Sequence, residues 1–241
     1  MINKNNLKIY SYEELKPFLV EENALVKLYE KAKDKSKFNV FFVYEGNIEI
    51  DNLNVSDDIG WATYYKFVNE QPVNSFFGPI ILGNINCKTL TFNKGLIIGD
   101  VNTKNMSISY SDEINSFSEI MGNLNIDELL FATGRGIWGK TFSMTVRKNV
   151  TINTLVNNEQ AIIKATNLTI SKEFNFPQIY ETEERGKHAL KSTNWSIHTL
   201  DELKTHFNIK YLKLDEYGKT VSFFFQEPTK LCKEYYKYVI D

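Results

Sequence analysis

The stretch Gly83-Asn84-Ile85-Asn86-Cys87-Lys88-Thr89-Leu90-Thr91-Phe92 decides the expected fold, because its apolar residues follow a broken alternation. Ile85 and Cys87 lie two residues apart, so in an extended chain their side chains share one face. Leu90 and Phe92 are spaced in the same way, but a step of three residues separates Cys87 from Leu90. A bend at this step would keep both pairs on one side, so the pattern predicts two short strands joined at a corner.

Four other segments follow this ten-residue pattern in the same order, which indicates an internal repeat. Most of them begin with Gly-Asn or Gly-Asp, but in the last one Lys148 replaces the glycine and the final apolar position is lost. A single unit cannot bury its own apolar face, whereas stacked units share a continuous core. The other units are residues 46–55, 99–108, 122–131 and 148–157.

An apolar run precedes the glycine in several units, as in Ile80-Ile81-Leu82 before Gly83. Glycine accepts positive φ, and Asn or Asp tolerates it, so the dipeptide is typical of a second corner. Each unit is therefore expected to hold three short strands and two corners. The predicted fold class is mainly β: a short parallel β-solenoid (β-helix) with an N-terminal helical cap and a small α+β C-terminal segment. The alternative is an antiparallel sandwich whose segments resemble one another by chance.

The two ends of the chain lack the repeat and set the expected domain boundaries. Ser11 and Glu14 fit the S-x-x-E capping box, and apolar residues continue at helical spacing over residues 13–33. Two strands are expected between Tyr211 and Phe225. The expected domains are an N-terminal helical cap at 1–37, the β-solenoid with loop insertions at 38–175, and a C-terminal cap or small α+β module at 176–241.

The insertions between units fall after the tenth position, so stacked units should place them along one edge. Insertions on one side of a repeat protein often form its binding surface, and aromatic and arginine side chains dominate interface hot spots. Alternatively, the aromatic side chains close the core. Asp57 and Asp58 contribute to an acidic excess in the first two insertions, which favours a basic partner. The predicted partner contacts are Trp61, Tyr64, Tyr65, Tyr110, Arg135 and Trp138.

The bulk composition excludes several classes of protein. A net charge of −2 provides no basic surface for nucleic acid. The apolar runs are far shorter than the roughly 18 residues that a membrane span needs. Cys87 and Cys232 form no C-x-x-C pair, so neither a disulfide framework nor a zinc site is expected. Together with an N-terminus that lacks an apolar signal segment, these features predict a cytoplasmic protein that binds neither nucleic acid nor membrane.

One segment, Gly134–Thr141, satisfies the nucleotide-binding pattern G-x-x-x-x-G-K-[ST]. The residues after it are rich in β-branched side chains and do not predict the helix that such a loop opens. Asp57 and Asp58 raise the possibility of sugar cleavage, but neighbours on a strand point in opposite directions and form no carboxylate pair. The histidines match no helical metal pair. We therefore predict no catalytic residue, no cofactor and no metal, with a nucleotide- or carbohydrate-acting enzyme as an alternative.

The units resemble a widespread set of bacterial β-solenoid repeat proteins, which repeat an apolar run, Gly-Asp-Leu, polar residues and a second apolar strand. Leu96-Ile97-Ile98-Gly99-Asp100-Val101 matches this pattern best, and the likeness covers about residues 40–165. Such proteins are often associated with polymorphic toxin systems. The resemblance therefore implies an immunity protein that neutralises a bacterial toxin domain by direct binding through the loop edge. It supplies no catalytic residues, and a self-associating structural scaffold is a further alternative.

Overall fold

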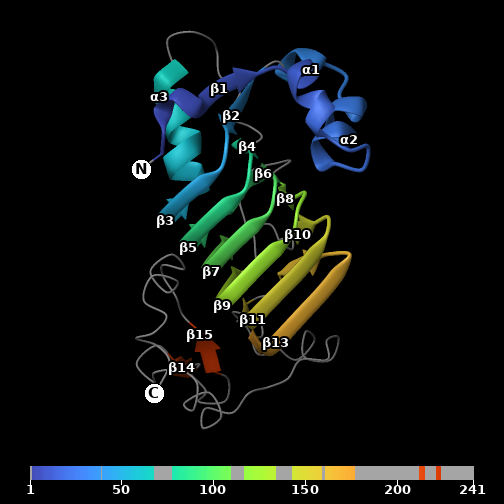
Figure 1. Cartoon of the computed structure of the whole chain (residues 1–241). Helices are drawn as coiled ribbons and strands as arrows, with labels where there is room; N and C mark the ends of the chain where they lie inside the picture. Colours follow the sequence, from blue (N-terminus) through green and yellow to red (C-terminus); the bar gives the residue numbers. More distant parts are fainter. Residues whose placement is uncertain are drawn as a thin grey trace.

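The computed structural model describes residues 2–38, 40–67, 78–109, 117–133, 143–158, 161–176, 212–214 and 221–223, and the described chain is mainly β (Figure 1). Two parallel sheets face each other, and the chain alternates between them. Sheet A has seven strands in the order β1-β2-β4-β6-β8-β10-β12, and sheet B has six in the order β13-β11-β9-β7-β5-β3. Every neighbouring pair in the two sheets is parallel except β1 with β2.

The strands of sheet A are short and those of sheet B are longer. Sheet A consists of β1 (Leu7–Tyr10), β2 (Phe41–Glu45), β4 (Ile80–Leu82), β6 (Gly95–Ile98), β8 (Ser118–Ile120), β10 (Ser143–Val146) and β12 (Ile162–Lys164). Sheet B consists of β3 (Ile48–Asn54), β5 (Ile85–Thr91), β7 (Val101–Ser109), β9 (Leu124–Thr133), β11 (Asn149–Asn158) and β13 (Asn167–Phe176).

The predicted fold class, a parallel β-solenoid built from units of three short strands, is wrong. The structure has two sheets of parallel strands, and each repeat contributes two strands, one to each sheet. The predicted corner inside the unit does not divide the strand. The pairing of β5 with β7 omits one position between Cys87–Thr103 and Thr89–Asn105 but keeps the same register on both sides, so the strand continues across the three-residue step. The broken alternation therefore changes which side chains point inward and does not end the strand.

The apolar positions of the repeat fill one core cluster between the two sheets. Leu90 and Phe92 are fully buried in it, and Cys87 packs against it, as the spacing predicts. The fourth unit departs from the pattern, because β9 holds one more residue than β7 between paired positions. As a result Leu130 and Ala132, and not the aligned Leu129 and Phe131, join the core cluster. The sequence alignment of that unit is therefore one residue out of phase in its second half.

Glycine at the corner from sheet A to sheet B is required by close stacking of the repeats. A Cβ on Gly99 would lie 2.3 Å from the carbonyl oxygen of Gly83, and one on Gly122 would lie 2.2 Å from that of Gly99. Real Cβ atoms never approach backbone so closely, so a side chain would push the strands apart. The predicted reason, positive φ, holds only for Gly46 among these corner glycines, with φ of 112°.

The residue after each glycine forms a hydrogen-bonded ladder along the same corner. Asn47 Oδ1 accepts from the backbone N–H of Asn84 at 2.9 Å, and Asn84 Oδ1 accepts from that of Asp100 at 2.8 Å. Asp100 Oδ1 accepts from the backbone N–H of Asn123 at 2.7 Å. Asn123 Oδ1 accepts from the backbone N–H of Asn149 at 3.3 Å and from its side-chain amide at 3.0 Å. Each repeat thus provides an acceptor for a backbone N–H of the next repeat, which fixes the register of the strands at the corner.

The N-terminal segment covers part of the outer face of sheet A, over β2, β4 and β6. Its helices are η1 (Lys4–Asn6), α1 (Tyr12–Leu15), η2 (Lys16–Phe18), α2 (Ala24–Lys31) and η3 (Lys35–Phe38). The capping box at Ser11 and Glu14 is confirmed. The continuous helical spacing over 13–33 does not produce one helix, because η2 ends at Phe18 and Asn23 caps a separate α2. Leu15 and Leu25 are fully buried in a second core cluster with strands of sheet A.

A buried carboxylate fixes the start of α2 on the sheet. Glu119 Oε2 accepts from the side-chain amide of Asn23 at 2.9 Å and from the backbone N–H of Ala24 at 3.0 Å. Its Oε1 forms an ion pair with Arg147, whose guanidinium also donates to the carbonyl of Glu22. Because Glu119 is only 1% exposed, removal of Arg147 would leave a buried carboxylate without its ion-pair partner. This network holds the N-terminal segment in one place.

The C-terminal residues from 177 onward are described only at β14 (Leu212–Leu214) and β15 (Val221–Phe223). These strands pair antiparallel, with Leu212 opposite Phe223, which confirms the two strands expected between Tyr211 and Phe225. The remainder of the predicted C-terminal cap or module lies outside the described residues. Within the described part of the chain, no helix has the length and apolar character needed to cross a membrane.

Candidate functional site

The connections from sheet B to the next strand of sheet A begin at one edge of the molecule, opposite the glycine corner. This follows from the parallel register, because the ends of β3, β5, β7, β9 and β11 lie side by side (Figure 1). The predicted insertions lie in these connections. The connection after β3 contains two described helices, η4 (Val55–Trp61), a π-helix, and α3 (Ala62–Phe67). π-Helical turns are rare and occur often at functional sites, which makes η4 and α3 the candidate functional segment.

One face of the segment η4–α3 covers the core at the end of the sheets where β3 lies. Val55 and Ile59 are fully buried in the cluster between the sheets, and Ala62 and Phe67 pack against it. Thr63 is also fully buried, and its hydroxyl donates to the carbonyl of Ile59 at 2.6 Å. These side chains cover the apolar interior at the end of the stack. The sequence interpretation that aromatic residues of this insertion close the core therefore applies to Phe67.

The other face of η4–α3 carries three aromatic rings in mutual contact, named here the aromatic cluster: Trp61, Tyr64 and Tyr65. The Trp61 side chain is 53% exposed and that of Tyr65 is 70% exposed, while Tyr64 is partly buried. The ring of Trp61 lies 5.6 Å from that of Tyr64 in an edge contact and 5.9 Å from that of Tyr65 in a tilted one. Trp61 and Tyr65 are therefore ordered by their neighbours without being needed for the core.

Polar contacts anchor the segment that carries the aromatic cluster. Asn54 caps η4, since its Oδ1 accepts from the backbone N–H of Asp57 at 3.3 Å. Asp58 accepts from the backbone N–H of Asn54 at 2.7 Å, and Asp57 accepts from the Asn54 amide at 2.6 Å. Both carboxylates thus stabilise the start of a helix, where negative charge is favourable, and do not form a pair across a substrate.

Lys66 ties the far end of the segment to the N-terminus of the protein. Its ammonium group donates to the backbone carbonyls of Lys4 and Leu7, both at 2.8 Å. It also lies 4.9 Å from the centre of the Phe67 ring. This cation is therefore occupied, and the exposed charge nearest in sequence to Trp61 is that of Asp57.

The structure tests only part of the predicted site. It brings Trp61, Tyr64 and Tyr65 together, whereas Tyr110, Arg135 and Trp138 lie outside the described residues. The segment Gly134–Thr141, with its nucleotide-binding pattern, is outside them as well, as are all three histidines and Cys232. Within the described ranges, no group of three or more His, Cys, Asp or Glu side chains could hold a metal ion.

Of the two cysteines, only Cys87 lies within the described residues, at an inward position of β5. Burial raises the pKa of its thiol to about 11, and a hydrogen bond with Thr103 opposes this rise. The contact joins the sulfur to the Thr103 hydroxyl at 3.5 Å. At neutral pH the group is a protonated thiol packed against the core, which fits a structural role and not that of a nucleophile.

Sequence reasoning missed an exposed apolar pair in the N-terminal segment. Phe18 is 46% exposed and Val20 is 43% exposed, although both fall within the stretch expected to form one amphipathic helix. The available signal was Pro17, which starts a short η2 and lets the chain leave the helical path after Phe18.

No protein-family model, no curated protein and no solved structure matches the chain.

Proposed function

We propose that the protein is a cytoplasmic protein-binding module, an immunity protein that binds a bacterial toxin domain directly and neutralises it through the aromatic cluster. One observation carries the proposal: Trp61 and Tyr65 stay exposed on a segment whose opposite face already closes the core. A large exposed aromatic pair has no folding role in this position. Such side chains are the commonest hot spots of protein interfaces.

The anchoring of the segment supports binding with little loss of entropy. The Asn54 cap, the two Lys66 contacts and the ring contacts within the cluster hold Trp61 in a defined place before a partner arrives. A preorganised surface binds more tightly than a mobile one, because fewer side chains must be ordered. Neutralisation then requires only that the partner's active surface be covered or held inactive.

Co-expression with the product of the neighbouring gene tests this proposal. The expected result is a complex that co-purifies and a rescue of growth when the neighbour is toxic. A double variant, Trp61→Ala with Tyr65→Ala, should weaken the complex about 100-fold, as for two hot-spot side chains. The matched control is Ile162→Ala with Leu168→Ala, which removes side chains that are 45% and 44% exposed on β12 and β13.

Three outcomes would contradict the proposal. The first is that neither a complex nor rescue is found with the neighbouring product. The second is a complex whose affinity is unchanged in the double variant. The third is an equal loss of affinity in the β12–β13 control, which would show a general effect of surface apolar residues. Far-ultraviolet circular dichroism of each variant establishes that the fold is retained.

A further inference from the structure

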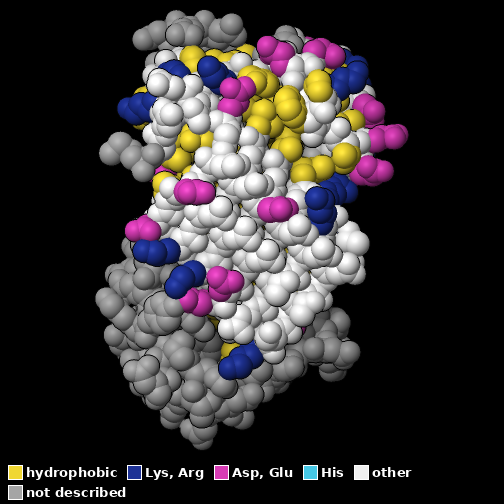
Figure 2. Space-filling model, in the orientation of Figure 1, with side chains coloured by type: hydrophobic (Ala, Val, Ile, Leu, Met, Phe, Trp, Pro, Cys, Tyr) yellow, Lys and Arg dark blue, Asp and Glu magenta, His cyan; other side chains and the backbone are white. Residues whose placement is uncertain are grey.

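A second apolar surface lies between the N-terminal segment and the ends of the strands of sheet A. Leu82, Ile98 and Met121 each immediately precede a corner glycine, and all three are partly buried against the second core cluster. Register places them in one row, since Leu82 pairs with Ile98, and Met121 donates its N–H to the carbonyl of Ile97. We name this row the apolar row. Figure 2 shows hydrophobic side chains gathered over this part of the molecule, above the polar face of sheet B.

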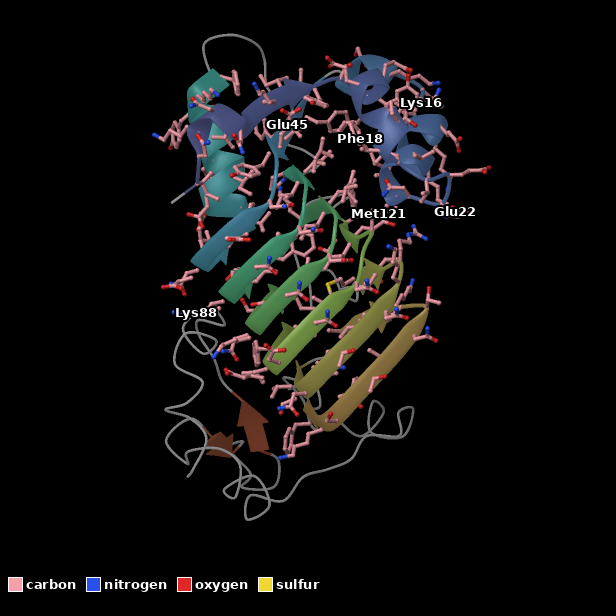
Figure 3. The ribbon with its side chains drawn as sticks, in the orientation of Figure 1. Lys16, Phe18, Glu22, Glu45, Lys88 and Met121 are labelled. Atoms are coloured by element: carbon pink, nitrogen blue, oxygen red, sulfur yellow. The ribbon has the colours of Figure 1, made fainter. Side chains whose placement is uncertain are left out.

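The N-terminal segment borders this row without closing it. The amide of Asn23 contacts the sulfur of Met121 at 3.4 Å, so the start of α2 lies over one end of the row. In Figure 3, Phe18 lies on the side of the N-terminal segment that faces β2 and β4. Its exposed fraction of 46% shows that this segment and the strands cover it only in part. We name the surface between Phe18 and the apolar row the apolar strip.

The spacing of the apolar row matches an α-helix better than an extended peptide. Neighbouring strands lie about 4.8 Å apart, so the row from Leu82 to Met121 spans about 10 Å. Two turns of α-helix advance about 11 Å, so side chains on successive turns would meet successive strands. Same-face residues of a strand repeat about every 7 Å and would fall out of step at once. The same face of sheet A already accepts a helix of this chain, because α2 packs on it through Leu25.

The charges at the ends of the row give the occupant a direction. Glu45 pairs with Leu82 and so continues the row at one end, where its carboxylate accepts from the Tyr10 hydroxyl. Arg147 continues it at the other end, but its guanidinium is neutralised by the buried Glu119. The free charge of the row is therefore negative and lies at the Glu45 end. A cation on the occupant would meet it there.

We propose that this strip is a docking site for an amphipathic α-helix of a partner protein. The helix lies along the apolar row, places apolar side chains from successive turns over Met121, Ile98 and Leu82, and sets a Lys or Arg over Glu45. Helix-in-groove recognition of this kind reads apolar anchors spaced by three and four residues. The site is separate from the aromatic cluster and does not rest on the toxin-binding proposal.

The probe that tests this site is a designed helical peptide. It carries Leu at i, i+4 and i+7 and Lys at i+11 on one face, with Ala and Gln elsewhere. One control peptide has Glu in place of the Lys, and a second has Ala in place of the three Leu. Each is titrated to about 1 mM, which is enough to detect a millimolar complex.

The readout is NMR of the full chain labelled with ¹³C at the methionine methyl groups. Met121 borders the strip, whereas Met106 and Met144 are fully buried in the core between the sheets and act as internal references. Met121→Leu assigns the reporter signal. The Leu–Lys peptide is expected to shift the Met121 signal saturably and to leave the two references unchanged.

Two charge variants sharpen the result. Glu45→Lys should weaken binding of the Leu–Lys peptide about 10-fold and improve binding of the Leu–Glu peptide. The matched control is Glu49→Lys, an equal charge change at an exposed position of β3. Trp61→Ala should leave the affinity unchanged, which separates this site from the aromatic cluster.

The proposal is overturned if Met121 does not shift, or if the Ala peptide shifts it equally. It is also overturned if Met106 and Met144 shift together with Met121, which would mean that the peptide perturbs the whole fold. Equal affinity of the Lys and Glu peptides, or an equal effect of Glu49→Lys, would reject the assigned direction and with it the basic anchor.

Discussion

The two edges of the molecule are built on the same strands and follow opposite rules. At the glycine corner, the second, third and fourth repeats each place a glycine and an Asn or Asp against the same positions of the preceding repeat. At the opposite edge, the described connections differ in length and content, from the short link between β5 and β6 to the two helices after β3. The corner shows how contact between repeats dictates residue type. At the opposite edge, where neighbouring repeats make no such contact, the connections can vary in length and residue type.

The strongest way to break this comparison is to place a side chain at the corner. Gly99→Ala adds a Cβ about 2.3 Å from the carbonyl oxygen of Gly83, where backbone must move. We expect a loss of about 3 kcal/mol or more in the free energy of unfolding, measured by urea denaturation. The control is Gly60→Ala in η4, where the nearest atom, Cδ of Pro79, would lie 3.8 Å away. That variant should be neutral or slightly stabilising, since Ala is the better helix former. Equal losses in both variants would refute the stacking explanation.

Reactivity of Cys87 measures how firmly the strands beside the corner are closed. The pKa of its thiol is raised to about 11 by burial, so at pH 8 its thiolate fraction is about 100-fold below that of a free cysteine. Alkylation by iodoacetamide in a Cys232→Ser background should be slower than that of the unfolded chain by at least this factor. Because the folded pKa is the higher one, the protonated thiol contributes stability below the unfolded pKa near 9, and this is lost as the pH rises through about 11. Rapid alkylation of the native protein at pH 8 would contradict the burial of this position.

The hydrogen-bonded ladder predicts a smaller effect at the same corner. Asn84→Ala removes the acceptor for the backbone N–H of Asp100, and we expect a loss of about 1 kcal/mol in unfolding free energy. Asn86→Ala is the matched control, because Asn86 accepts only from the exposed side chain of Asn102. It should cost less than about 0.5 kcal/mol. If both substitutions cost the same, the ladder adds nothing specific to the corner.

The smallest effect on stability is expected at the opposite edge. Trp61→Ala with Tyr65→Ala removes two large side chains that stand outside the core, so the unfolding free energy should change by less than about 1 kcal/mol. Phe67→Ala on the buried side of the same helix should cost about 2 kcal/mol or more. Thermal unfolding of the two variants measures this difference. A large loss of unfolding free energy in the variant of the exposed pair would mean that the aromatic cluster stabilises the fold, and it would contradict its role as a binding surface.

Local spacing in the sequence predicts which side chains point inward, and it fails where the answer depends on a neighbouring repeat. Alternation places Leu90 and Phe92 in the core, because side-chain direction in a strand is set by residue order. It cannot show that pairing continues past the three-residue step, nor that β9 has an extra residue, because both are properties of two strands together. The glycines illustrate the same limit, since a carbonyl from the repeat before, and not the local φ, excludes a side chain at Gly99.

For the candidate site as well, the sequence predicts which residues lie in one segment but not which of them are buried. The sequence gathers Trp61, Tyr64, Tyr65 and Phe67 into one insertion, but their spacing alone does not say which face of a helix is covered. That is settled by Val55 and Ile59, which turn one face to the core and leave Trp61 and Tyr65 outside. Pro17 signals that the helical path ends near Phe18, but how much of Phe18 stays exposed depends on where α2 begins on the sheet.

The ladder at the corner has a consequence for protein engineering. Since the ladder fixes the position of each repeat against the next, the strand ends at the opposite edge are held at set distances, whatever chain joins them. A longer connection then costs only the entropy of closing a larger loop, about 0.6 kcal/mol for each doubling of its length. Foreign peptides of different lengths could be grafted between β5 and β6 at residues 93–94, beside the natural helices after β3. The molecule would serve as a display scaffold, with the spacing between displayed segments set by the distance between strands.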